Sequence, residues 1–339
     1  MMDILPTFPS LDAEIACPCC ETAGRAKPVL AVPYRAIWEL LASEWDARFS
    51  EEVIRRHTPC EETCLLECGE CGLQFFYPPE GGDKQFYREL GGSPRYYVPC
   101  KWEFGWVRDR LSRPMAVLDV GCGKGDFLMT LDGKVRRAVG LEQNSAAAAA
   151  AIGRGLDVVA VRVEKFAQEN AGAFDAVCAF HVVEHLPAVL PFLRRLLGCL
   201  RPGGALFLSL PNRNRSGSPS LEPLDCPPHH LSRWSPAQVR KLGEVLGVRL
   251  AEFACEPVEI SVPRDRLREA VTTGLGKIPV AGEFLALWGS RVASRAVFFS
   301  PFCSLYRQLG LFERMGFQGP SMVVHFLRTG NGENRREGS

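Results

Sequence analysis

Two cysteine pairs and one glycine-rich loop have residue types and spacings that could do chemistry. Cys17 with Cys20, and Cys68 with Cys71, each form a Cys-x-x-Cys pair in which two thiolates can reach one ion. Together the pairs can complete the tetrahedral site that structural zinc prefers. The interval between them is longer than the usual ~15–20 residues, so residues 33–57 are expected to loop out as one or two amphipathic helices. Three other thiols could replace one of these ligands: Cys19, Cys60 and Cys64.

The glycine-rich loop follows a predicted buried strand, in the stretch VLDVGCGKGDFL. Its glycines, Gly121, Gly123 and Gly125, let the backbone turn tightly and let a ligand approach more closely than a Cβ would permit. Asp119 stands two residues before the first glycine, and Glu142 ends the next predicted strand. A carboxylate in that second place can accept hydrogen bonds from both hydroxyls of a ribose, so the pattern predicts a nucleoside ligand.

The spacing of the glycines distinguishes three kinds of nucleotide ligand. A P-loop requires Gly-x4-Gly-Lys followed by Ser or Thr, which this loop lacks. A dinucleotide loop requires Gly-x-Gly-x2-Gly, where the helix N-terminus holds a pyrophosphate. Here the spacing is Gly-x-Gly-x-Gly, and the nearby acid would repel a pyrophosphate but attract an ammonium group. S-adenosylmethionine carries an ammonium and a sulfonium and no phosphate, so the loop favours that cofactor over a nicotinamide dinucleotide.

Alternating strand-like and helix-like segments surround the loop, which is typical of a parallel sheet with crossover helices. Strands are expected at 115–120, 136–142, 156–161, 174–180, 205–210, 249–258 and 321–328. Helices are expected at 145–154, 186–200 and 235–247, the last with Ser235 as N-cap and Pro236 at the first helical position. An aromatic-rich, helical lead-in precedes the sheet.

The composition is that of a folded protein of about two domains. The chain has 339 residues, of which 46% are hydrophobic and 23% charged, with a net charge of +1. A nucleic-acid clamp usually shows a basic excess, so no nucleic-acid partner is expected. We find no signal peptide and no apolar run of about 18 residues, so no membrane span is expected. Clustered thiols without a secretory signal favour metal binding in a reducing, cytoplasmic compartment.

Four stretches stand in the order and spacing of a known family: VLDVGCGKGDFL, VGLEQN, FDAVCAFHVVEHL and LRPGGALFLSLPN. Over residues 115–260 the sequence resembles class I S-adenosylmethionine-dependent methyltransferases. CGLQFFYPP and PPHHLSRWSP resemble the subgroup with an N-terminal zinc-ribbon-like module. The resemblance implies an α/β, Rossmann-like sheet of seven strands with helices on both faces. Its antiparallel last strand would be residues 321–328.

The resemblance also implies a division of the chain and a set of cofactor contacts. The segments are a cysteine-rich zinc module at 1–83, an aromatic lead-in or lid at 84–114, the cofactor-binding catalytic domain at 115–260, and a helical insertion with the last strand at 261–339. The methionine moiety would lie on Asp119, Gly121, Cys122, Gly123 and Gly125. Glu142 would hold the ribose, Gln143 would lie beside the adenine, Val163 and Glu164 would flank the adenine ring, and Phe180 and His181 would lie near the methyl group. The stretch VRVEKF departs from the Gly-Asp pattern common in the family.

Four histidines are candidates for chemistry on a methyl acceptor. Methyl transfer is an in-line displacement in which the protein supplies position and, for a hydroxyl acceptor, a base. Histidine suits that role near neutral pH. His181 and His185 follow the fourth predicted strand, and His229 and His230 follow the fifth, so all four are expected at the carboxyl edge of the sheet. A divalent cation at these residues is an alternative role.

The sequence therefore predicts a methyltransferase with structural zinc, acting on a hydroxyl of a small-molecule or sugar-like acceptor. Nitrogen or carbon acceptors and the oligomeric state are left open, and residues 84–106 and 264–314 are expected to cover the pocket. One alternative is a zinc-dependent binding module with an idle cofactor fold. Another is a radical S-adenosylmethionine enzyme, because Cys64, Cys68 and Cys71 have the spacing that binds an iron–sulfur cluster, although Glu70 stands where an aromatic is usual.

Overall fold

The computed structural model describes residues 15–96, 101–216, 221–257 and 318–329. The chain forms two compact units, one of residues 1–211, 221–254 and 323–339 and one of residues 212–220 and 255–322. In the second unit the side-chain amide of Asn212 donates hydrogen bonds to Gln318 Oε1 and to the carbonyl oxygen of Gly319, both at 3.1 Å. The predicted cover at 264–314 lies outside the described residues.

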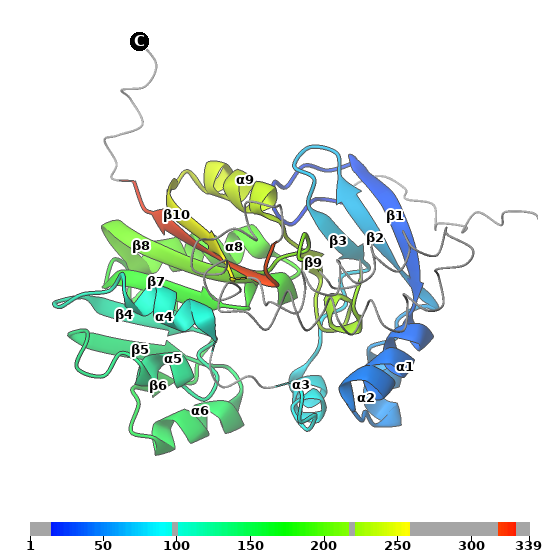
Figure 1. The fold of residues 1–339 in the computed structure, drawn as a ribbon, viewed down its shortest axis with the longest axis horizontal. Helices are drawn as coiled ribbons and strands as arrows, with labels where there is room; N and C mark the ends of the chain where they lie inside the picture. Colours follow the sequence, from blue (N-terminus) through cyan, green and yellow to red (C-terminus); the bar gives the residue numbers. More distant parts are fainter. Residues whose placement is uncertain (1–14, 97–100, 217–220, 258–317, 330–339) are drawn as a thin grey trace, which may run out of the picture. The chain divides into compact units, whose positions relative to one another are not determined.

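A seven-stranded sheet forms the centre of the first unit (Figure 1). In spatial order its strands are β10 (Arg249–Cys255), β11 (Ser321–Leu327), β8 (Leu200–Pro211), β7 (Phe174–Phe180), β4 (Ala116–Val120), β5 (Arg137–Leu141) and β6 (Val158–Val159). The pairs β4–β5, β4–β7, β5–β6 and β7–β8 are parallel. Backbone hydrogen bonds join Gly203 and Gly204, near the start of β8, to Arg328, just after the end of β11. The last strand is therefore antiparallel, and the predicted seven-stranded α/β fold is confirmed.

Helices bury both faces of this sheet, as a parallel sheet requires. On one face, helix α4 (Trp102–Arg108) adds Val107 to a buried cluster with residues of β4, β7 and β8. The alternate residues of β7 and β8 are fully buried as well, and helix α8 (Val189–Cys199) packs on these two strands. The other helices of the domain are α5 (Asp126–Met129), α6 (Ser145–Gly153), α7 (Val163–Glu169) and α9 (Pro236–Leu246).

Three of the expected elements differ in detail from the observed ones. The strand expected at 156–161 is reduced to the two residues of β6. The helix expected at 186–200 begins only at Val189, after a 3₁₀ turn at Val183–His185. Ser235 is the N-cap residue of α9 and Pro236 its first residue, as predicted, but the Ser235 hydroxyl donates to Gln238 Oε1 and accepts no hydrogen bond from the helix backbone.

The cysteine-rich region folds around a second sheet, which the sequence analysis did not predict. Strands β1 (Ala26–Pro33), β2 (Glu62–Cys68) and β3 (Gln74–Tyr77) pair in antiparallel fashion. A short strand from the catalytic segment, β9 (Ser232–Arg233), pairs with β3. The predicted insertion forms two helices, α1 (Tyr34–Trp45) and α2 (Glu51–Arg56). Because β9 completes this sheet, the module packs on the loop that carries the predicted histidine pair.

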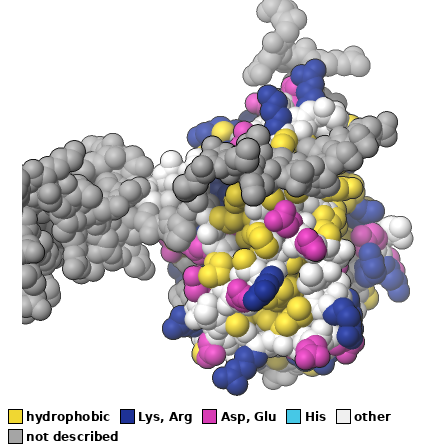
Figure 2. All heavy atoms as spheres, turned by 90° about the vertical axis from the view of Figure 1, so that its right-hand side faces the viewer, with side chains coloured by type: hydrophobic (Ala, Val, Ile, Leu, Met, Phe, Trp, Pro, Cys, Tyr) yellow, Lys and Arg dark blue, Asp and Glu magenta, His cyan; other side chains and the backbone are white. Residues whose placement is uncertain are grey.

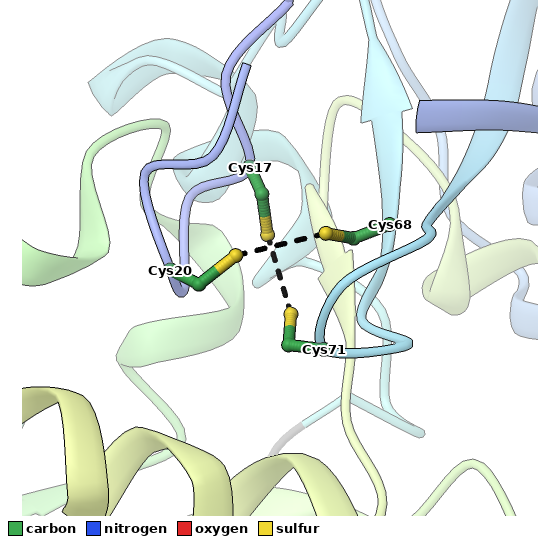
Figure 3. Close-up of side chains that lie close together, drawn as sticks. All are labelled: Cys17, Cys20, Cys68 and Cys71. Atoms are coloured by element: carbon green, nitrogen blue, oxygen red, sulfur yellow. Dashed lines mark hydrogen bonds between the residues drawn. The ribbon is translucent and has the colours of Figure 1, made fainter. Parts of the chain in front are cut away.

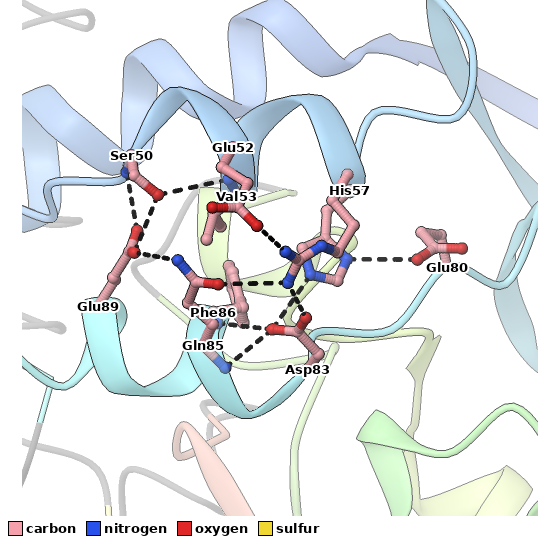
Figure 4. Close-up of polar contacts among 10 residues, drawn as sticks. Ser50, Glu52, Val53, His57, Glu80, Asp83, Gln85, Phe86 and Glu89 are labelled. Carbon is pink, nitrogen blue, oxygen red and sulfur yellow. Dashed lines mark hydrogen bonds and ion pairs between the residues drawn. The ribbon is translucent and has the colours of Figure 1, made fainter.

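Polar contacts tie helix α2 to helix α3 (Lys84–Leu90), as Figure 4 shows. The hydroxyl of Ser50 caps α2, and Glu89 of α3 accepts hydrogen bonds from both the N–H and the hydroxyl of Ser50 at 2.8 and 2.9 Å. Asp83 caps α3 and pairs with Arg56. Burial alone would raise the pKa of Asp83, but hydrogen bonds from the backbone of α3 and from Arg56 lower it to about 2. His57 lies buried between Glu80 and Asp83.

The described surface mixes both signs of charge. On the face shown in Figure 2, acidic and basic side chains are interspersed among hydrophobic ones. Among the described helices, none is both long and apolar enough to cross a membrane. Every cysteine in the described ranges is a free thiol.

Candidate functional site

The glycine loop connects β4 to helix α5 at the carboxyl edge of the sheet. Gly121, Gly123 and Gly125 have φ angles of 76°, 56° and 82°, a region that residues with a Cβ rarely adopt. A Cβ added at Gly121 would lie 2.7 Å from Val182 Cγ2, whereas one added at Gly123 would meet no atom within 4 Å. The loop is therefore packed against the segment after β7 at Gly121 and opens into free space at Gly123.

Asp119 is a buried carboxylate beneath this loop. It is 2% exposed, and its Oδ1 accepts no hydrogen bond from any described residue. Burial, reinforced by the charge of Glu142, raises the pKa of Asp119 to about 8. An uncompensated buried carboxylate is costly, and a bound cation would relieve that cost.

Glu142, at the end of β5, connects the loop to the next turn. One carboxylate oxygen accepts a hydrogen bond from Gly123 N–H at 2.9 Å, and the other accepts one from Asn144 N–H at 2.6 Å. A carboxylate has about four lone-pair sites, so acceptor capacity for ribose hydroxyls is left.

The other residues predicted to contact the cofactor differ in burial and in the side chains around them. The Cys122 side chain is buried against Gly140 of β5, so only the backbone of Cys122 is left to contact a ligand at the loop. Gln143 is exposed just after β5. Val163, buried, and Glu164, paired with Arg162, begin helix α7. Phe180, at the end of β7, packs edge-on against Phe104 of α4, with ring centroids 4.9 Å apart.

His181 is held between two buried carboxylates. Its Nε2 lies 2.8 Å from Glu103 Oε1 of helix α4, and its Nδ1 lies 3.2 Å from Glu184 Oε1. Burial and Lys101 would lower the pKa of His181, but the two carboxylates raise it. Burial would raise the pKa of Glu184, but its bond to His181 lowers it to about 2. With both ring nitrogens engaged, His181 is placed to hold α4 over the site.

The other three predicted histidines form one cluster, together with two tyrosines. The ring centroids of His229 and His230 lie 4.2 Å apart, and that of His185 lies 4.7 and 4.9 Å from them. The hydroxyl of Tyr96 lies 3.1 Å from His229 Nε2, and that of Tyr87 lies 3.0 Å from His185 Nδ1. Burial lowers the pKa of His185 to about 4 and holds the pKa of His229 well below its usual range. Both rings are therefore neutral near pH 7.

The four predicted zinc ligands meet at one end of the second sheet (Figure 3). The sulfur of Cys17 lies 3.5 Å from that of Cys71, and the sulfur of Cys20 lies 3.6 Å from that of Cys68. Zn–S bonds of about 2.3 Å in a tetrahedron place sulfurs about 3.8 Å apart, so the spacing fits one zinc ion. Hydrogen bonds from Cys17 and Cys19 lower the pKa of Cys71, which favours a thiolate there.

Three residues of the site were not singled out as functional from the sequence. Glu103 has a detectable signal, an acid inside the otherwise aromatic stretch WEFGW. Tyr87 and Tyr96 lie within residues 84–106, which were expected to cover the pocket, but no local pattern connects them to histidines more than 90 residues away.

Comparisons with known proteins bear on the domain that carries the loop. Residues 104–252 match the family model of a methyltransferase domain. A ubiquinone biosynthesis O-methyltransferase of Pseudomonas paraeruginosa is 31% identical over 32% of this chain and 50% of its own length. The enzyme of the same name from Vibrio parahaemolyticus is 33% identical over 29% of this chain and 44% of its own length. The chain thus spans about half the length of the curated relatives it matches. A solved S-adenosylmethionine-dependent methyltransferase from Archaeoglobus fulgidus matches 66% of this chain and 94% of its own at 19% identity, with a TM-score of 0.42.

Proposed function

We propose that this chain, which carries a methyltransferase domain over residues 104–252, transfers the methyl group of S-adenosylmethionine to a hydroxyl of a small-molecule or sugar-like acceptor. The observation that carries the cofactor assignment is the uncompensated carboxylate of Asp119 beneath an open glycine loop. An ammonium group would stabilise the ionised form of this carboxyl and supply its missing partner, whereas a phosphate would destabilise the ionised form.

The residues present fit the cofactor. Asp119 and the backbone of Gly121 and Gly123 would hold its methionine moiety, and Glu142 would accept hydrogen bonds from its ribose. When bound, the cofactor supplies an electrophilic methyl group on a sulfonium, and the protein's task is to position the acceptor and exclude water. Gln143, Val163 and Glu164 are proposed as the adenine contacts from their places after β5 and at the start of α7.

The acceptor is proposed to lie against the histidine cluster. His181 and Val182 follow directly after β7 beside Gly121, and the same short segment leads to His185. A neutral imidazole there can take a proton from an acceptor hydroxyl. The names of the matched relatives, O-methyltransferases, agree with an oxygen acceptor.

The four-cysteine cluster is proposed to bind structural zinc. It lies at the end of β2 that leads into β3, and β3 pairs with β9, three residues after His229. Zinc would therefore stabilise the sheet that holds the histidine loop. We propose a reducing compartment such as the cytoplasm, because so many free thiols would tend to form disulfides in an oxidising one.

Isothermal titration of the purified chain with S-adenosylmethionine, together with elemental analysis, tests the proposal. We expect micromolar-range binding that is lost in Glu142→Ala and retained in Glu244→Ala. Glu244 is a matched control because its carboxylate is exposed and pairs with Lys241 on the surface of α9. Zinc without cofactor binding would support a binding module with an idle fold instead. Iron with inorganic sulfide would support a radical enzyme, and competition by NAD would support an oxidoreductase.

A further inference from the structure

The ring nitrogens of the three histidines in the cluster lie close enough together to bind one metal ion. Each residue presents a ring nitrogen within 4.8 Å of the other two. His229 and His230 are 5% and 7% exposed, and His185 is partly exposed, so the cluster is largely buried and solvent reaches it at His185.

The contacts of the Nδ1 atoms determine which nitrogens carry protons. His185 Nδ1 lies 2.6 Å from the carbonyl oxygen of His229, and His229 Nδ1 lies 2.8 Å from the carbonyl oxygen of Leu224. A carbonyl can only accept, so both Nδ1 atoms carry the proton and both Nε2 atoms present a lone pair. His230 Nδ1 faces the carboxylate of Asp225 at 3.8 Å, which favours the same tautomer.

This pattern is the one that supports metal-binding imidazoles. A histidine ligand nearly always donates its second N–H to a carbonyl or a carboxylate, which fixes the ring and directs the other nitrogen at the ion. Among the described residues, none hydrogen-bonds to Nε2 of His185 or of His230. Nε2 of His229 accepts from the Tyr96 hydroxyl, and a cation at the cluster would replace that hydrogen bond.

Negative charge next to the cluster also favours a cation. Glu184 is fully buried and interacts electrostatically with His185 and His230. Its Oε1 is engaged by His181, but its Oε2 accepts no hydrogen bond from any described residue. A divalent ion at the neighbouring imidazoles would compensate the charge of this buried carboxylate.

We propose that His185, His229 and His230 bind a divalent transition-metal ion of the zinc type through their Nε2 atoms, with one position left open. Three imidazoles with an open position are the ligand set of a reactive zinc centre, in contrast to the closed four-thiolate site. Such an ion would bind an acceptor's oxygen and lower the pKa of that hydroxyl. The proposal goes beyond the proposed function, since metal binding at this cluster does not depend on methyl transfer.

Zinc stoichiometry and zinc-edge X-ray absorption on the full chain test the site. After loading with zinc and desalting, we expect about two zinc ions per chain and a mixed shell, with sulfur near 2.3 Å and nitrogen near 2.0–2.1 Å. His230→Gln should retain about one zinc with sulfur ligands only. His325→Gln is the matched control, because its ring also faces a carboxylate, Glu252, but lies outside the cluster; it should retain both ions.

The wild-type spectrum decides the question even if His230→Gln fails to fold, which circular dichroism would reveal. A wild-type chain that retains about one zinc, with sulfur as the only ligand, overturns the proposal. Two ions that persist in a folded His230→Gln chain overturn it as well. Calorimetry with S-adenosylmethionine on the same samples separates failure of the metal site from failure of the proposed function, because the cofactor loop shares no residue with the cluster.

Discussion

Cofactor affinity should depend steeply on pH, because the proposed ammonium partner is protonated in the free protein. Burial raises the pKa of Asp119 to about 8 from an ordinary value of 3.8. Below pH 8 the free site therefore holds a neutral acid, and an ammonium ligand must expel its proton before an ion pair can form. Binding is thus coupled to the release of one proton.

The magnitude follows from that pKa. At pH 6 only about 1% of Asp119 is ionised if its pKa is about 8, so affinity should rise tenfold per pH unit, about 1.4 kcal/mol each, from pH 6 toward pH 8. Above pH 8 affinity should fall again, because the α-amino group of the ligand loses its own proton with a pKa near ~8. The profile should be a bell with its maximum near pH 8.

Isothermal titration in buffers of different ionisation enthalpy measures both the affinity and the protons released. S-adenosylhomocysteine, which has the same ammonium but no sulfonium, should give the same slope. Asp119→Asn should remove the slope below pH 8 and weaken binding at pH 8 by about 1.5–3 kcal/mol, the contribution of one charged hydrogen bond. A wild-type affinity that stays flat from pH 6 to pH 8, with no proton released, would refute the assignment of Asp119 as the ammonium partner.

Three further predictions concern the loop, helix α4 and the thiol cluster. Gly121→Ala should lower the free energy of unfolding by roughly 2 kcal/mol or more, because its Cβ would lie 2.7 Å from Val182 and its φ is positive. Gly123→Ala, with open space around it, should lower the free energy of unfolding by about 1 kcal/mol yet abolish cofactor binding. Equal losses of stability for the two variants in urea unfolding would contradict this difference. Glu103→Gln should lower the free energy of unfolding by about 3 kcal/mol at pH 6 and by less at pH 9. The pKa of His181 is raised, so its ion pair with Glu103 is fully present below pH 6.5 and is lost as pH rises through the folded-state pKa. The same loss of stability at both pH values in denaturant titrations would argue against the charged pair. Removal of zinc by a chelator should lower the melting temperature and expose the four thiols to a thiol reagent, whereas thiols that stay unreactive in metal-free protein would show that packing alone holds the cluster.

Local sequence patterns were sufficient for the parts of the site that lie on one strand and its following turn. The glycine spacing and Asp119 predicted a tight, open loop because positive φ and a missing Cβ are properties of single residues. Glu142 was predicted from its place at the end of a strand, since the ends of parallel strands meet at one edge. The strands of the cysteine-rich module were missed because their pairings join residues far apart in the chain, such as Ala26 with Cys68 and Phe75 with Ser232.

The amino-acid sequence by itself determined the strands of the seven-stranded sheet, the glycine loop and the two cysteine pairs, because each is a pattern of residues close together in the chain. The tertiary structure alone decided what each histidine contacts. It placed Glu103 of α4 within hydrogen-bonding distance of His181, a contact that no local sequence pattern indicates. It also brought the rings of His185, His229 and His230 into one cluster. The physical reason is that a side chain's partners, protonation and access depend on atoms that only folding brings within a few ångströms.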